Sequence, residues 1–115
     1  MHRDYRLYLD DILEAIDRIH EYVQGIDAGV FSSDKKTQDA VIRNLEVIGE
    51  AASNLPDNIK IEAEEIEWRK IIGLRNILAH EYFGVSIPIV WDIIQNKLNS
   101  LKKTCVKLLG TSEDT

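Results

Sequence analysis

Apolar residues recur along most of the chain at alternating spacings of three and four positions, the pattern of helices with one buried face. The repeat predicts four main helices: residues 4 to about 24, a second closing at residues 56–57, residues 67–79, and a fourth beginning after residue 86. No useful length of sequence alternates between apolar and polar residues as a strand would. We therefore predict an all-α, up-and-down four-helix bundle with a possible short extra helix.

The fourth predicted helix has the longest repeat, which is typical of packing along a bundle seam. Ser86 is a candidate N-cap, and Pro88 is tolerated in the first turn. The apolar positions are Ile87, Trp91, Ile94, Leu98, Leu101, Cys105 and Leu108. Residues 111–115 form a polar tail, so residues 1–110 are predicted to be a single helical domain.

The segments between the predicted helices contain residues that are typical of turns and helix caps. Residues 25–33 hold two glycines and are predicted to be a loop, which ends in the N-cap candidates Ser32, Ser33 and Asp34. The acidic residues 62–65 are predicted to be a linker or the first turn of a short helix. Gly49 lies beside the apolar stripe of the second helix, where a missing side chain lets another helix approach closely.

The third predicted helix has apolar residues around nearly its whole circumference, so we expect it to be buried on most sides. Arg75 nevertheless lies on the same stripe as Trp68. A buried arginine is costly unless it is paired or faces a polar cleft. From the residues alone, Arg75 either pairs with an acid such as Glu46 or Glu50, extends its charged end to solvent, or serves a functional site.

Composition and charge narrow the functional classes. The chain has 115 residues and 44% hydrophobic residues, enough for a core without disulfides. A single cysteine, Cys105, and the lack of an apolar leader or spanning run favour a cytoplasmic protein without a membrane partner. The net charge of −6 argues against a DNA-coating protein. Nucleic-acid contact would be local, for example at Arg69, Lys70 and Arg75, unless these form an ordinary solvated face.

His80 is the best placed of three histidines for proton transfer, although a lone histidine is more often structural. It follows Arg75 by five residues, which is about 140° around a continuous helix. The two side chains therefore converge only if the helix ends or distorts near His80, or if they meet across two chains.

Arg75, His80 and Tyr82 together form an Arg, four residues, His, one residue, Tyr pattern. This pattern resembles the signature of the HepT-like branch of the HEPN superfamily. Residues 43–51 and 68–76 are similar to the second- and third-helix segments of that family, and residues 82–85 and 89–91 continue the likeness.

The resemblance implies a HEPN-like fold and the toxin of a toxin–antitoxin pair, acting as a metal-independent endoribonuclease without a cofactor. It implies a homodimer whose partner is a minimal nucleotidyltransferase antitoxin, which silences the toxin by transferring AMP to Tyr82.

The chemistry of the residues is compatible with RNA cleavage. Arg75 can stabilise charge on a phosphate, and His80 can carry one proton, but the chain offers no convincing second carrier. A symmetric dimer would supply one by bringing both residues from each chain into one cleft. Asn76 could orient a neighbour, and Tyr82 could hydrogen-bond the phosphate, stack on a base, or be a core aromatic.

The remaining candidates are more simply structural. Glu46 and Glu50 are four residues apart, but no histidine joins them, so we predict no metal site. Cys105 is predicted to be a core residue, and Trp68 and Trp91 to be packing residues. The alternative functional class is a non-catalytic helical binding module that partners a nucleotidyltransferase. A structural bundle without a partner is the third alternative.

Overall fold

The computed structural model describes residues 4–80 and 86–113, with the backbone alone for residues 76–80 and 111–113. The described residues form only helices and no strand, which confirms the all-α prediction. In chain order the helices are α1 (Tyr5–Val23), α2 (Ala28–Ser33), α3 (Lys35–Ser53), α4 (Asp57–Ile61), α5 (Trp68–His80), α6 (Ile87–Asn96) and α7 (Leu98–Glu113).

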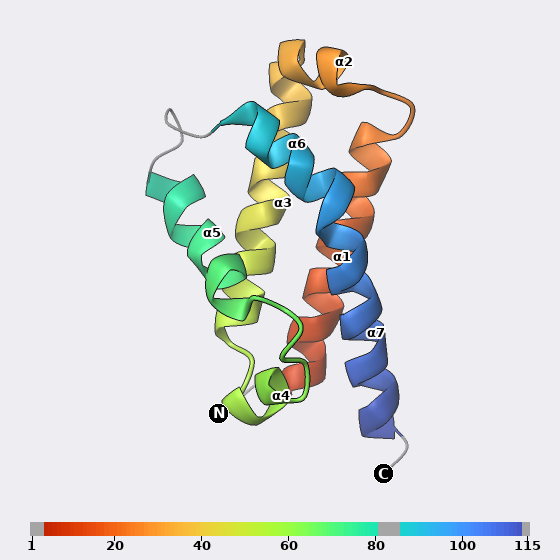
Figure 1. Ribbon diagram of the computed structural model, residues 1–115, viewed down its shortest axis with the longest axis vertical. Helices are drawn as coiled ribbons and strands as arrows, with labels where there is room; N and C mark the ends of the chain where they lie inside the picture. The colour runs from red at the N-terminus through yellow and green to blue at the C-terminus, as the bar shows by residue number, and fades with distance from the viewer. Residues whose placement is uncertain (1–3, 81–85, 114–115) are drawn as a thin grey trace.

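The four long segments run alternately up and down, as predicted (Figure 1). Helix α1 leads to the end of the bundle that carries α2, α3 returns, α5 rises beside α3, and α6 with α7 runs back to the C-terminal end. Helix α3 packs against both α1 and α5, and α7 packs against α1. None of the helices in the described part of the chain combines the length and apolar content needed to cross a membrane.

The apolar stripes of α1 and α3 supply much of the core, and buried residues of the other helices complete it. The α3 stripe is buried at every predicted position, namely Val41, Leu45, Ile48, Ala52 and Leu55. Both helices begin at an aspartate cap: Asp4 accepts a hydrogen bond from the Arg6 amide, and Asp34 accepts one from the Thr37 amide. The additional hydrogen bond from the Thr37 hydroxyl holds the pKa of Asp34 below its ordinary value.

The predicted loop at residues 25–33 was wrong in part, because α2 occupies its second half. Gly25 adopts a φ of 78°, a left-handed conformation that favours glycine, and turns the chain out of α1. Asp27 then caps α2 by accepting a hydrogen bond from the Val30 amide at 2.9 Å. Phe31 is fully buried and anchors the short helix to the bundle. A second short helix, α4, ends before the acidic residues 62–65, which connect it to α5, so the linker alternative is confirmed.

The fourth predicted helix is in fact two helices, α6 and α7, separated at Lys97. Lys97 has φ −116° and ψ −35°, so the chain changes direction there although it lacks proline or glycine at this point. The bend lets α6 contact α2 while α7 follows α1. Trp91 packs on Phe31 with ring centroids 5.1 Å apart. Ser86 is the N-cap as predicted, but its side chain makes no capping hydrogen bond.

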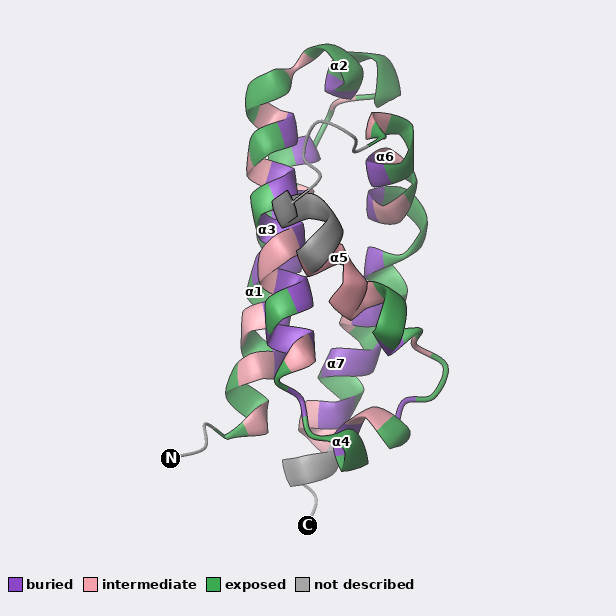
Figure 2. Cartoon of the chain, turned by 90° about the vertical axis from the view of Figure 1, so that its left-hand side faces the viewer, coloured by how far each residue is buried: buried purple, intermediate pink, exposed green. Residues whose placement is uncertain are grey.

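The expectation that the third predicted helix is buried on most sides was wrong for the described side chains of α5. Trp68 is buried, whereas Ile71, Ile72 and Leu74 are only half-buried, as Figure 2 shows along α5. The reason is that α5 has α3 as its main packing partner. At the other end of the chain, α7 continues to Glu113, so the predicted polar tail is helical up to that residue.

Candidate functional site

Arg75 lies on α5 at a close contact between that helix and α3. A Cβ atom added at Gly49 of α3 would lie 2.9 Å from the Arg75 backbone nitrogen and 3.0 Å from the Ile71 carbonyl oxygen. The predicted close approach at Gly49 is therefore confirmed. Because Gly49 lacks a side chain, Arg75 is brought directly over the outer surface of α3.

The guanidinium of Arg75 is paired with α3. Its Nη1 atom donates hydrogen bonds to Oε2 of Glu50 at 2.9 Å and to Oγ of Ser53 at 3.1 Å. Of the alternatives derived from the sequence, pairing with Glu50 is thus confirmed. Glu46 has a different partner, Arg43, with an N–O separation of 3.6 Å.

The backbone and side chains at the end of α3 fix the groups that hold Arg75. The Ser53 hydroxyl donates its hydrogen to the Glu50 carbonyl oxygen at 2.7 Å, so its lone pair is available to accept from Arg75. The Asn54 amide nitrogen donates to the same carbonyl at 2.9 Å. The side chains of Arg75 and Glu50 are 37% and 60% exposed, so this ion pair contributes little to stability. Its main consequence is the orientation of the guanidinium.

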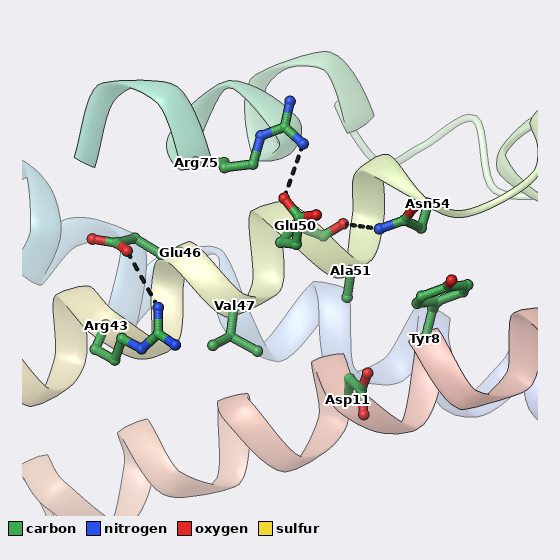
Figure 3. A pocket seen from close by; sticks show the side chains of 9 residues that line it. All are labelled: Tyr8, Asp11, Arg43, Glu46, Val47, Glu50, Ala51, Asn54 and Arg75. Carbon is green, nitrogen blue, oxygen red and sulfur yellow. Dashed lines mark hydrogen bonds and ion pairs between the residues drawn. The ribbon is translucent and has the colours of Figure 1, made fainter. Parts of the chain in front are cut away.

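A cavity of about 380 Å³ opens beside this pair (Figure 3). Arg75 approaches it from α5, whereas Tyr8 and Asp11 approach it from α1, with α3 between them. Its lining comprises Tyr8, Asp11, Arg43, Glu46, Val47, Glu50, Ala51, Asn54 and Arg75. The cavity therefore offers two arginines, Arg75 from α5 and Arg43 from α3, and carboxylates along its length.

The other predicted site residues are placed only by their backbone or lie outside the described residues. Asn76 and His80 belong to α5, and His80 is the last described residue of that helix, so the predicted helix end near His80 is not tested by the described residues. Their side chains and Tyr82 lie outside what the structure describes. The proximity of His80 and Tyr82 to Arg75 therefore stays a prediction.

Sequence reasoning missed Ser53, which the structure brings to Arg75, and several residues of the cavity, among them Tyr8 and Asp11. Ser53 follows Glu50 by three residues on one helix face, a spacing that could have indicated it. Tyr8 and Asp11 are three residues apart on α1, but nothing in their pattern indicates that α1 borders Arg75.

The residues interpreted as structural are core or packing residues. Cys105 is fully buried, and burial raises the pKa of its thiol to about 12. Trp68 donates its indole N–H to the Ala63 carbonyl at 3.1 Å, and Trp91 packs on Phe31. Among the described residues, no three side chains of His, Cys, Asp or Glu are grouped so that they could hold a metal ion.

The fold and the site together describe one class of protein. It is an all-α helical bundle in which an oriented arginine lies beside an open cavity. The family described as "Ribonuclease HepT-like" matches residues 12–108, which include the motif and at least part of every long helix. The chain belongs to this HepT-like family of the HEPN superfamily, as its motif predicted.

Several relatives are similar over nearly their whole length. "Probable ribonuclease HepT" of Thermococcus cleftensis is 44% identical over 108 residues, covering 94% of this chain and 98% of the relative. "Putative RNase MJ0127" of Methanocaldococcus jannaschii is 43% identical, covering 88% of this chain and 84% of the relative. "Putative RNase TTE0752" of Caldanaerobacter subterraneus is 38% identical, with coverages of 90% and 93%. No solved structure matches the chain.

Proposed function

We propose that the chain is an endoribonuclease that acts as a homodimer through Arg75 and His80. Membership of a family described as ribonuclease and relatives named as ribonucleases support the activity. The observation that carries the assignment to Arg75 is its placement: a partly exposed side chain, held by Glu50 and Ser53, beside an open cavity.

Arg75 binds the phosphate of the RNA in this proposal. A guanidinium has five N–H donors, and the two contacts to α3 arise from Nη1 alone. The remaining donors can form the paired hydrogen bonds that suit phosphate oxygens. Glu50 and Ser53 act as positioning groups, because they hold the guanidinium without blocking all of its donors. Asn76, the next residue on α5, is a candidate to orient a neighbouring group.

His80 transfers protons. It accepts the proton of a 2′-hydroxyl, the 2′-oxygen attacks phosphorus, and the bond from phosphorus to the 5′-oxygen breaks. The leaving 5′-oxygen takes a proton from water and His80 returns its own proton to solvent, so the products are a 2′,3′-cyclic phosphate and a 5′-hydroxyl. Arg75 stabilises the charge that develops on the phosphoryl oxygens. No step in this proposal uses a metal ion, so we expect cleavage in EDTA.

The proposed dimer follows from the continuity of α5. This helix includes both Arg75 and His80, which places the two residues about 140° apart around its axis. A second copy related by two-fold symmetry can complete the set, because it presents its own His80 to the Arg75 of the first chain. It would also cover the half-buried apolar residues of α5.

Mixing two inactive variants tests this arrangement. Arg75→Ala and His80→Ala chains are combined after brief unfolding and refolding, and RNA cleavage is compared with each variant alone. In a shared site, mixed dimers retain one intact Arg75 and one intact His80, so activity should return to about a quarter of the wild-type level at most. Activity that does not return on mixing, despite exchange of chains, would contradict the shared site.

We further propose that the chain is the toxin of a toxin–antitoxin pair and that Tyr82 is its regulatory AMP acceptor. Transfer of AMP from ATP to the tyrosine hydroxyl releases pyrophosphate and leaves a phosphodiester charge two residues beyond His80. This charge would compete with RNA for Arg75, and the adenosine would obstruct the site. A neighbouring minimal nucleotidyltransferase is the proposed donor enzyme.

Mass spectrometry after incubation with that nucleotidyltransferase and ATP tests the modification. The expected result is AMP on Tyr82, none on Tyr82→Phe, and loss of RNA cleavage by the modified protein. AMP on Tyr5, Tyr8 or Tyr22 instead, or normal cleavage after modification of Tyr82, would reject the proposal. In that case, or if the unmodified chain does not cleave RNA, the non-catalytic binding module is the better interpretation.

A further inference from the structure

The cavity beside Arg75 extends well beyond the groups that the cleavage chemistry uses. Cleavage needs Arg75 at one end, yet the cavity reaches across α3 to Tyr8 and Asp11 on α1 (Figure 3). Its volume of about 380 Å³ lies at the small end of the range for ligand sites, about 300–1,000 Å³. A space of this size accommodates one nucleotide and not a double helix.

The lining of the cavity has the composition of a base-binding site. Val47 and Ala51 follow each other by one turn of α3 and give an apolar surface between the polar ends. Tyr8 is half-buried beside this surface and adds an aromatic ring. An apolar surface with an aromatic neighbour is suited to the face of a nucleobase, since stacking needs no particular hydrogen bonds.

The polar groups of the cavity include three carboxylates, which only accept hydrogen bonds when ionised. These belong to Asp11, Glu46 and Glu50, and the cavity also contains two arginines. Each arginine already has a carboxylate partner, Glu50 for Arg75 and Glu46 for Arg43. Asp11 is the carboxylate on the α1 side, opposite Arg75 across α3. A carboxylate accepts up to about four hydrogen bonds, so it can bind a donor of the ligand in addition to its contacts in the protein.

We propose that this cavity binds one unpaired nucleobase of the RNA, adjacent to the phosphate held by Arg75, and that Asp11 makes it prefer guanine. Guanine presents two neighbouring donors, N1–H and the N2 amino group, which match the two oxygens of one carboxylate. Uracil, adenine and cytosine offer no such pair of donors on that edge. Asp11 is thus a specificity-determining residue, and Tyr8 supplies stacking for any base. The inference rests on the proposed ribonuclease function, because it assumes RNA at Arg75.

Binding of RNA that cannot be cleaved tests the preference separately from catalysis. The probes are fluorescein-labelled 2′-fluoro hexamers of uridine with one central position changed to G, A, C or U, bound to the full chain and measured by anisotropy. Because guanine would donate hydrogen bonds to the charged carboxylate of Asp11, we expect the G probe to bind about tenfold more tightly than the U probe. Asp11→Asn, which replaces an acceptor oxygen by a donor, should reduce this ratio to about twofold or less.

Two further variants provide the controls. Asp10→Asn makes the same chemical change at the exposed neighbouring residue, which does not line the cavity, and should keep the full ratio. Tyr8→Leu should weaken binding of all four probes by about fivefold or more, because it removes stacking but keeps an apolar side chain. Circular dichroism checks that each variant is folded.

The outcomes separate this inference from the proposed function. Equal binding of the four wild-type probes, no binding of any probe, or an unchanged G-to-U ratio in a folded Asp11→Asn variant would overturn the base site. Cleavage of natural RNA by the same preparation would show that the nuclease assignment survives that result. A G preference that depends on Asp11 would support the site even if the rate of cleavage proved to be low.

Discussion

Helices α3 and α5 lie against each other and are both rich in apolar residues, but they are buried to very different extents. The α3 stripe is buried throughout, and Val41 and Leu45 have no exposed surface. Ile71, Ile72 and Leu74 of α5 are half-buried. Helix α3 is covered by α1 on one side and α5 on another, whereas α5 has α3 as its main partner. An apolar pattern thus predicts that a surface needs cover, but not whether the same chain supplies it.

This comparison divides the two helices by role: α3 supports the fold, and α5 presents Arg75. The largest expected effect is therefore on activity, from α5. Arg75→Ala and His80→Ala should each reduce RNA cleavage by about a hundredfold or more, because charge stabilisation and proton transfer typically contribute factors of this size. The measurements are initial rates on a single-stranded RNA and thermal unfolding by circular dichroism, which should change little.

Arg69→Ala is the matched control for that prediction. Arg69 is an exposed arginine on the same helix and does not line the cavity of Arg75. It should leave cleavage within about threefold of wild type, since only general attraction to RNA is lost. Equal losses in Arg69→Ala and Arg75→Ala would indicate that overall positive charge, and not the Arg75 site, supports activity.

The second prediction concerns stability and should show the reverse order of the helices. Leu45→Ala on α3 should lower the free energy of unfolding by about 2–5 kcal/mol, the range for a fully buried leucine. Ile72→Ala on α5 should cost less than about 1.5 kcal/mol, because its side chain is only half-buried in one chain. Urea unfolding measures the free-energy change of both variants, at a protein concentration low enough to favour monomers.

Self-association provides a further test of the difference in burial between α3 and α5. If a second copy covers α5, Ile72→Ala should weaken the dimer in sedimentation experiments, whereas wild-type protein near micromolar concentration should have about twice the mass of 13.2 kDa. A wild-type monomer that cleaves RNA would mean that the exposed apolar residues of α5 serve another contact.

The third prediction acts on the junction between the two helices. Gly49→Ala would place a methyl group 2.9 Å from the Arg75 nitrogen, so α5 must move away. Overpacking costs about 1–3 kcal/mol and outweighs the helix propensity that alanine adds. We expect a net loss of about 1–2 kcal/mol in urea unfolding, and slower RNA cleavage because Arg75 moves with its helix.

Gly73→Ala is the control for the junction. A Cβ at Gly73 on α5 would have no neighbour within 4 Å, so this substitution should stabilise the protein by up to about 1 kcal/mol. Opposite signs for the two glycines would confirm that the close contact, and not helix propensity, sets the effect at Gly49. The same sign for both would contradict it.

The regular parts of the fold could be predicted because the periodicity of buried residues is local information. The stripes of α1 and α3 and the caps Asp4 and Asp34 follow from spacing and side-chain chemistry. The bend at Lys97 could not be predicted in this way, since the apolar repeat continues unbroken through it. Only the weak helix formers around it, Asn96 and Asn99, gave any signal.

The candidate site, like the fold, could be predicted from the sequence only in part. Arg75 stood out because a charge on an apolar stripe needs a partner, and Glu50 was one of the two candidates named from its position. Tyr8 could not be connected to Arg75, because it is far away in sequence and reaches the cavity only through the packing of α1 on α3. Distant contacts of this kind depend on the tertiary arrangement and leave no periodic signal in either helix.

The smallest expected effect separates the roles of Glu50. Its pair with Arg75 is exposed, so Glu50→Gln should change the free energy of unfolding by less than about 1 kcal/mol. Glutamine keeps an acceptor oxygen for Nη1 but removes the anion that competes with RNA phosphate for the guanidinium. We therefore expect a lower KM for RNA with kcat within about threefold of wild type, whereas Glu50→Ala should lower kcat because the arginine loses its orientation.

Glu46→Gln is the control that decides whether this effect is local. It removes the same charge from the same cavity one turn earlier on α3, where the carboxylate pairs with Arg43 and not with Arg75. A general reduction of negative charge would lower KM equally in both variants, since RNA is repelled by either carboxylate. A larger change for Glu50→Gln would show that the direct contact matters. Steady-state kinetics at two salt concentrations distinguish the cases, because only the general effect should largely disappear at high salt.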